Sequence, residues 1–281
     1  MTVVTSTAVP RPTRPAPRPV TDAMTMLGRQ LRHVLRYPEL TVIVLMIPVI
    51  FLLLFVFVFG GTLGAGLGAA AAPGAAGDRG DYAAFVLPGI LLLTIGSIAQ
   101  GTSTSMAMDM QQGIIDRFRT LSISPGAVLS GHALAATIQS VASVIVVVLV
   151  GLAAGARPSA GPDEWLLALA LVSGVALAVS WVSVALGLLS RTVESASNYP
   201  MPFVLLPFLG SGFVPTDSMP TVLRWFADLQ PFTPIMDTLR GLLLGTAFST
   251  ATAALAVGWV LALTVGGWLW ARRVYARPRR A

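Results

Sequence analysis

Long apolar runs separated by short polar intervals make up most of the 281 residues. A helix needs about 20 mostly apolar residues to cross the hydrocarbon core of a bilayer, where every backbone polar group must be paired within the protein. The pattern therefore predicts an all-α membrane protein with six transmembrane helices. The predicted spans are residues 41–59, 83–107, 127–152, 165–190, 199–213 and 251–271. The fifth span is short and is interrupted by Pro200, Pro202 and Pro207.

The longest polar interval between two of these runs covers residues 109–132, between the second and third spans. A helix that opens at Gly113 would carry its apolar residues on one face for about two turns. These residues are Ile114, Ile115, Phe118 and Leu121. Ser, Pro and Gly in residues 122–126 would then end the helix. At the membrane surface such a helix can serve another protein as a handle, or it can be a solvated helix that only joins two spans.

The chain before the first span changes character at residue 21. In residues 21–38 the apolar side chains share one helical face, and Arg29, Arg32 and Arg36 lie on the opposite face. We expect this helix to lie in the headgroup layer with its arginines on anionic lipid; the alternative is an ordinary cytosolic helix. Residues 1–20 are rich in Pro and Arg and are expected to form a disordered cytoplasmic tail. The remaining residues, 21–281, would form a single transmembrane domain.

Prolines punctuate residues 210–246, which follow the fifth span, and separate two short helical patterns. Thr216 or Asp217 can cap the first helix, and Thr233-Pro234 can start the second. Both helices would be amphipathic enough to dip into the outer leaflet as a short extracellular hairpin. Such a hairpin can be a loop that plugs the outer end of the bundle, an outer gate, or both.

The charge distribution predicts the orientation. Only 11% of the residues are charged, against about 25% in soluble domains, which fits a lipid-facing surface. The 18 basic residues are all arginines and flank the apolar runs, so nucleic acid is not an expected partner. If the N-terminus is inside, the outer segments hold only Arg79, Arg157, Arg224 and Arg240. The positive-inside rule therefore predicts that both termini and residues 109–132 are cytoplasmic.

Catalytic and metal-binding chemistry has little support in the sequence. There is no cysteine, and the two histidines, His33 and His132, are far apart. None of the predicted spans holds Asp, Glu, Lys or Arg, of which an ion-coupled transporter usually needs at least one. The chain also lacks a G-x-x-x-x-G-K-[ST] loop and the common hydrolase signatures. We therefore expect no catalytic residue, metal or cofactor on this chain, and an energy source outside it.

Two stretches resemble the membrane permease subunits of ABC-2 type exporters, in particular their daunorubicin/doxorubicin-resistance (DrrB-like) group. Residues 113–119, followed by Ser124-Pro125, resemble the cytoplasmic segment that couples these permeases to their ATPase. Residues 211–241 resemble a later signature with fixed spacing, and the similarity extends over nearly the whole chain. Gln111, Gln112 and Ser122 depart from the residues that are usual in the family.

The resemblance implies a half-transporter in a bacterial cytoplasmic membrane. Two permease chains, as a homodimer in the lipid, would join two separate ATPase subunits that bind ATP and Mg. The implied ATPase-coupling residues are Gly113, Ile114, Ile115, Asp116, Arg117, Phe118 and Arg119. The implied outer-gate signature is Ser211, Gly212, Phe213, Pro215, Met219, Pro220, Pro231, Thr233, Pro234 and Arg240.

Several functions remain open at this stage. The resemblance implies export of amphipathic or hydrophobic compounds, such as drugs, metabolites or lipids. A pathway lined by Phe, Leu, Met and small residues, without a charged group, suits such molecules. The alternatives are a membrane scaffold with no transport cycle and a membrane-embedded enzyme.

Overall fold

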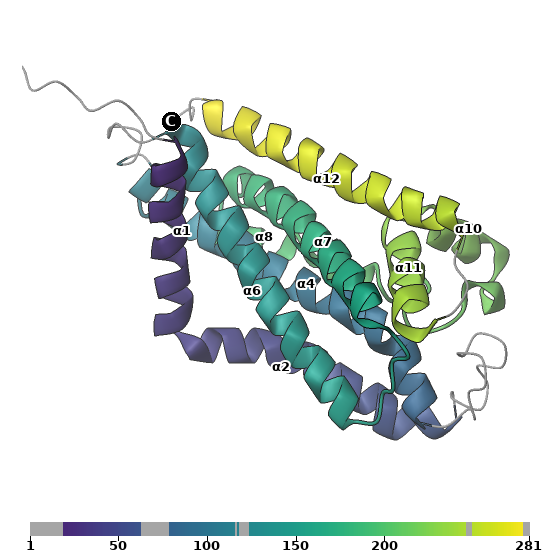
Figure 1. Ribbon diagram of the computed structural model, residues 1–281. Coiled ribbons are helices and arrows are strands. Elements are labelled where there is room, and N and C mark those ends of the chain that lie inside the picture. The colour runs from purple at the N-terminus through teal and green to yellow at the C-terminus, as the bar shows by residue number, and fades with distance from the viewer. Residues whose placement is uncertain (1–18, 63–78, 116, 118–123, 246–248, 278–281) are drawn as a thin grey trace, which may run out of the picture.

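The computed structural model describes residues 19–62, 79–115, 117, 124–245 and 249–277, and these form helices and turns without a strand among them. The helices are α1 (Pro19–Arg36), α2 (Pro38–Leu54), the π turn η1 (Phe55–Phe59), α4 (Arg79–Gln111), α6 (Pro125–Ala153), α7 (Pro162–Leu189), α8 (Val193–Asn198), α9 (Met201–Leu205), the 3-10 turn η3 (Thr216–Ser218), α10 (Thr221–Leu229), α11 (Phe232–Leu244) and α12 (Thr250–Ala276). Figure 1 shows them as one helical bundle.

Five helices in the described part of the chain are long and apolar enough to cross a membrane. They are α2 with its continuation through η1, α4, α6, α7 and α12, and they correspond to the first four predicted spans and the last one. Residues 199–213 do not form a sixth such helix. Only Met201–Leu205 is helical there, and the chain then runs in turns to Phe213, since three prolines deprive the backbone of N–H donors.

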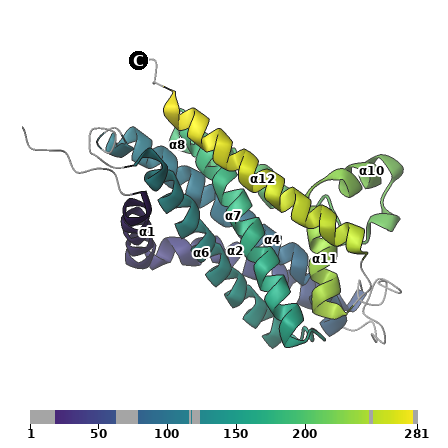
Figure 2. The same cartoon turned by 45° about the horizontal axis from the view of Figure 1, so that its top comes forward.

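Helix α4 forms the centre of the bundle. Its most apolar part is completely buried, whereas only 11% of the corresponding part of α12 is buried. Helices α2, α6, α7 and α11 pack around α4, and α12 lies along α7 (Figures 1 and 2). The surrounding helices turn large apolar side chains outward, such as Leu149 of α6 and Leu261 of α12. Their outer faces therefore suit contact with lipid.

The irregular residues 199–213 run along α4 in the direction opposite to it. A Cβ atom at Gly96, near the middle of α4, would lie 2.6 Å from the carbonyl oxygen of Phe203. A Cβ atom at Gly89, two turns nearer the start of α4, would lie 2.9 Å from the Cα atom of Gly212. The two glycines thus allow the irregular backbone to approach the helix more closely than any side chain would permit.

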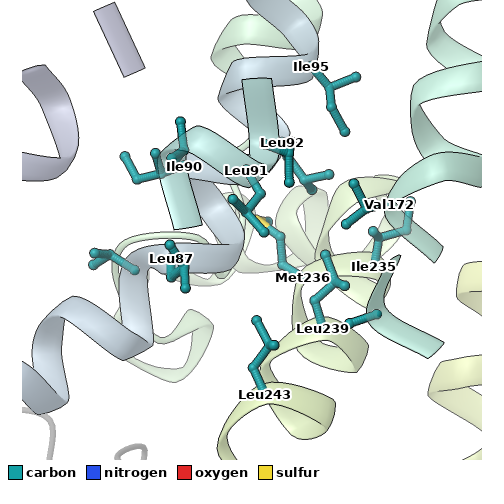
Figure 3. Packing of buried hydrophobic residues seen from close by; sticks show 14 of the residues in the cluster. Leu87, Ile90, Leu91, Leu92, Ile95, Val172, Ile235, Met236, Leu239 and Leu243 are labelled. Atoms are coloured by element: carbon teal, nitrogen blue, oxygen red, sulfur yellow. The ribbon is translucent and has the colours of Figure 1, made fainter. Parts of the chain in front are cut away.

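Helix α11 is buried along nearly its whole length. Figure 3 shows its side chains in one apolar cluster with α4 and α7: Ile235, Met236, Leu239 and Leu243 of α11, Leu87, Ile90, Leu91, Leu92 and Ile95 of α4, and Val172 of α7. This helix therefore contacts protein along most of its length, and its insertion to the depth of the outer leaflet stays a prediction. It inserts into the protein, because its polar groups find partners there instead of at a lipid surface.

Helix α10 differs in this respect. It exposes Val222 and Trp225, whose exposed fractions are 82% and 68%. It begins after Pro220 and not at a cap formed by Thr216 or Asp217, which lie in or next to the separate turn η3. Only the first of the two predicted short helices therefore presents an apolar face to the surroundings.

The two ends of the bundle carry different elements. Figures 1 and 2 place α1 and the C-terminal end of α12 at one end, and α10 and α11 at the other. Helix α1 meets α2 at a sharp corner, where Pro38 occupies the first turn of α2. Since α1 already starts at Pro19, residues 19 and 20 belong to a helix and not to the predicted tail. The rest of that tail, residues 1–18, lies outside the described residues.

We expect Gly96→Ala to destabilise the protein by about 1–3 kcal/mol, since the added methyl group must push back the backbone of Phe203. The matched control is Gly101→Ala in the same helix, where nothing lies within 4 Å of the added Cβ atom and alanine favours the helix. Thermal unfolding of the purified protein in detergent measures both. Equal melting temperatures for the two variants would contradict this account of the contact.

Candidate functional site

The predicted ATPase-coupling segment begins where α4 ends. Helix α4 stops at Gln111, and Gly113 follows with a φ of +68°, a left-handed conformation that ends helices and that glycine adopts at little cost. Ile114 and Ile115 then resume a helical conformation. Ile115 is fully buried in a cluster with Met26 of α1 and residues of α6 and α7. The segment is therefore attached to the bundle by an apolar side chain at its start.

The remaining coupling residues are described only in part. Arg117 is helical and exposed. Asp116, Phe118 and Arg119 lie outside the described residues. The contact of this segment with an ATPase stays a prediction.

A buried ionic cluster lies beside this segment and joins three helices. Arg29 of α1 donates from Nη2 to both carboxylate oxygens of Asp109 of α4, at 2.8 and 2.7 Å. His132 of α6 lies with Nε2 3.1 Å from Oδ2 of Asp109, and the Gln30 amide nitrogen lies 3.2 Å from Nδ1 of His132. The Gln30 amide nitrogen also lies 2.8 Å from Nε2 of His132, so the imidazole ring contacts both Asp109 and Gln30.

The ionic cluster corrects one expectation about the N-terminal helix. Arg29 was expected to face anionic lipid with Arg32 and Arg36, but it faces the bundle and pairs with Asp109. Arg32 and Arg36 are exposed. Helical periodicity separates the polar face of α1 from the apolar one but does not tell which of them packs on the protein. Asp109 lies near the polar C-terminal end of α4. A carboxylate at this position of the sequence is the signal from which a cationic partner could have been predicted.

A second ionic cluster lies at the end of the bundle that carries α11. Arg240 of α11 is buried and donates from Nη1 to Oδ1 of Asp237 at 2.9 Å, from Nη2 to the carbonyl oxygen of Ser211 at 2.5 Å, and from Nε to that of Phe85 at 3.3 Å. Its guanidinium also lies 4.0 Å from the centre of the Phe85 ring, a cation–π geometry. Ser211 in turn donates to Asp237 at 2.6 Å. Arg240 therefore fastens α11 to α4 and to the irregular segment.

Gln230 makes a second set of polar contacts between the start of α11 and the irregular segment. Its amide nitrogen donates to the carbonyl oxygen of Leu206 at 3.2 Å and contacts the hydroxyl of Thr233 at 3.0 Å. Thr233 donates to the carbonyl oxygen of Ala227 at 2.5 Å. Gly210 lies against this pair with no room for a side chain. The turn that follows α9 is thus held by polar side chains at and just before α11.

The predicted outer-gate signature is brought together only in part. Ser211, Gly212, Thr233, Pro234 and Arg240 gather where the irregular segment, α4 and α11 meet. Phe213 stacks on Phe208 and Phe55, with ring centres 4.4 and 4.6 Å apart. Pro231 precedes α11, and Pro215, Met219 and Pro220 lie apart, on the connection through η3 to α10. The gathered residues form a joint between the irregular segment, α4 and α11, and its opening as an outer gate stays a prediction.

A pocket of about 280 Å³ opens beside this joint, between α11 and the start of α12. It is lined by Asp228, Thr233, Pro234, Asp237, Ala251, Thr252 and Leu255. Asp237 is held by Arg240 and Ser211, and Asp228 lies 3.9 Å from Arg224. Among the described residues, no group of three or more His, Asp or Glu side chains could hold a metal ion.

Comparisons with known proteins agree with this architecture. The ABC-2 type transporter family matches residues 21–244, most of the chain. The chain is also similar to the daunorubicin resistance ABC transporter permease protein DrrB1 of Streptomyces coeruleorubidus. The two are 29% identical over 230 residues, which cover 81% of this chain and 77% of that protein.

We expect Arg240→Met to destabilise the protein by about 3 kcal/mol, because it leaves buried carbonyl oxygens without their donor. The control is Arg224→Met in α10, which breaks an exposed pair with Asp217 and should cost less than about 1 kcal/mol. Tryptophan fluorescence during thermal unfolding in detergent reports both. Equal decreases in melting temperature for the two substitutions would contradict the role of Arg240 as a buried hydrogen-bond donor.

Proposed function

Since the chain belongs to the ABC-2 type transporter family and is the membrane subunit of an ABC transporter, we propose that it forms the export pathway of an ATP-driven exporter. The observation that carries this proposal is a bundle of membrane-length helices around α4, with a family match that extends through α11. The chain contains no G-x-x-x-x-G-K-[ST] loop that could hold ATP phosphates. ATP and Mg would therefore bind to a separate ATPase subunit, present in two copies.

Residues 199–213 would provide the sixth crossing of the membrane. Their contacts with Gly96 and Gly89 support this topology, because these glycines lie within the buried length of α4. With six crossings, both termini lie on one side, which the arginine distribution predicts to be the cytoplasm. The coupling residues Gly113 to Arg119 would then face the ATPase from the cytoplasmic end of α4.

The irregular crossing also supports a second permease chain. Nonhelical backbone within a bilayer is tolerated where protein or a water-filled cavity covers it, because lipid offers no hydrogen-bond partner. Residues 206–214 form turns, yet Leu209 and Val214 are 40% and 42% exposed in the single chain. A homodimer that encloses a pathway next to this face would cover it.

The substrate class we propose is amphipathic or hydrophobic compounds, including drugs, metabolites and lipids. The side chains that residues 199–214 leave exposed are apolar: Tyr199, Met201, Pro202, Leu205, Leu209 and Val214. Such a surface suits the binding of a hydrophobic molecule, and it offers no charged group that could bind a hydrophilic one. The similar permease is named for daunorubicin resistance, which fits this class.

The test is ATP-dependent transport by the complex of this chain with its ATPase in lipid vesicles. We expect uptake of a fluorescent amphipathic drug into inside-out vesicles when ATP is present, and stimulation of ATP hydrolysis by the drug. The same assay tests the coupling residues, because replacing Phe118 and Arg119 by alanine should abolish uptake while the protein still folds. Arg157→Ala, in the connection between α6 and α7, is the control and should transport normally.

Failure of the complex to move any of several amphipathic compounds, despite ATP hydrolysis, would favour the nontransporting scaffold. Drug conversion by the purified chain without nucleotide would favour an enzyme. Normal uptake by the Phe118 and Arg119 double variant would remove the coupling role from these residues while leaving the transport function in place.

The absence of cysteine makes the orientation testable with single cysteines. Arg117→Cys and Arg157→Cys place a thiol at exposed positions that should lie on opposite sides of the membrane. We expect a membrane-impermeant maleimide to label Arg157→Cys in intact cells and to label Arg117→Cys only after the cells are opened. Labelling of Arg117→Cys from outside would reverse the proposed topology.

A further inference from the structure

Helix α1 contacts both ends of the coupling segment. Arg29 binds Asp109, two residues before the end of α4. Asp22, nearly two turns earlier in α1, accepts a hydrogen bond at 3.1 Å from the backbone N–H of Ser124, the residue that precedes α6. Residues 110–123 lie between these two attachments in the sequence. One helix therefore contacts the chain just before and just after the predicted coupling residues.

The attachment at Asp109 is well shielded from water. The side chains of Asp109 and His132 are 11% and 3% exposed, and Arg29 is 36% exposed. A carboxylate at this burial is stable as an ion only with its partners in place, so Arg29 and Asp109 separate with difficulty. The contact of Gln30 with His132 extends the same attachment to α6.

Helices α1 and α6 pack closely against each other. A Cβ atom at Gly131 of α6 would lie 2.5 Å from Cβ of Met26, so the two helices touch through their backbones at this point. Met26 is buried and shares its cluster with Ile115 of the coupling segment. Ile115 and α1 therefore pack into the same apolar cluster.

The face of α1 opposite Arg29 carries exposed apolar side chains. Val20, Met24 and Leu35 are 76%, 60% and 78% exposed and lie on one side of the helix. Such a stripe on a helix beside membrane spans is typical of one that rests in the lipid interface. Helix α1 thus has one apolar face that suits the membrane interface and an opposite polar face that contacts the chain on both sides of the coupling segment.

We propose that α1 is a clamp on the coupling segment, with Arg29 and Asp22 as its positioning residues. This inference rests on the proposed function. The clamp fixes the separation between Asp109 and Ser124, so that a push on residues 112–123 moves α4 and α6 together. Without the clamp, Asp109 and Ser124 can move apart when the ATPase pushes on the segment, so the push no longer moves α4 and α6 together.

The test measures drug molecules transported per ATP hydrolysed by the reconstituted complex. We expect Arg29→Ala and Asp22→Ala each to lower this ratio about tenfold, within the range of coupling between distinct sites. The control is Arg32→Ala, an exposed arginine on the same helix, which should keep the wild-type ratio. Arg29→Lys, and the exchanged pair Arg29→Asp with Asp109→Arg, should recover most of the loss by restoring a charge pair.

Amide hydrogen exchange on the permease alone supplies a readout that needs no transport. Asp22→Ala should speed exchange at Ser124, and Arg29→Ala should speed it at residues 109–113, with Arg32→Ala again unchanged. Wild-type coupling together with wild-type protection in Arg29→Ala and Asp22→Ala would overturn the clamp. A wild-type complex that transports nothing would overturn the proposed function, while the exchange rates would still decide whether α1 holds the segment. If Arg29→Ala fails to fold, the exchanged pair decides, and an uncoupled but folded exchanged pair would contradict the proposal.

Discussion

A backbone carbonyl that is buried away from water needs a donor within the protein, and this constraint shapes the half of the protein around α11. Regular helices meet it internally, but the turns after α9 do not. The carbonyl oxygens of Leu206 and Ser211 instead accept from the side chains of Gln230 and Arg240. Both donors must lie inside the bundle to reach them, and α11 therefore packs against α4 instead of lying on the surface.

The same constraint explains which parts of the fold the sequence predicts. Spans one to four and span six follow from run length, because a continuous apolar helix needs no partner to satisfy its backbone. The burial of α11 does not follow from its pattern, since an arginine and an aspartate three residues apart look like the polar side of a surface helix. Their role appears only when Ser211 and Phe85, distant in sequence, are brought to Arg240.

The candidate site also has one part that the sequence predicts and one part that it does not. The stretch after α4 is recognisable from its polar residues and its glycine, and Gly113 does interrupt the helix there. The ion pair of Arg29 with Asp109 could not be predicted from the sequence. Helical periodicity assigns Arg29 to one face of α1 but does not tell whether that face contacts lipid, water or protein. An apolar stripe on a membrane protein can face lipid while the polar face packs on the protein, which inverts the usual expectation for soluble helices.

The order in which the chain is made gives the ionic cluster a further consequence. Arg29 precedes Asp109 by 80 residues, and Gln30 precedes His132 by 102. The ribosome therefore delivers α1 long before the groups that neutralise its polar face exist. The contacts of Arg29 with Asp109 and of Gln30 with His132 can form only once these later residues have been made. Residues from nearly the beginning of the chain therefore acquire these polar partners only after α4 and the start of α6 have been added.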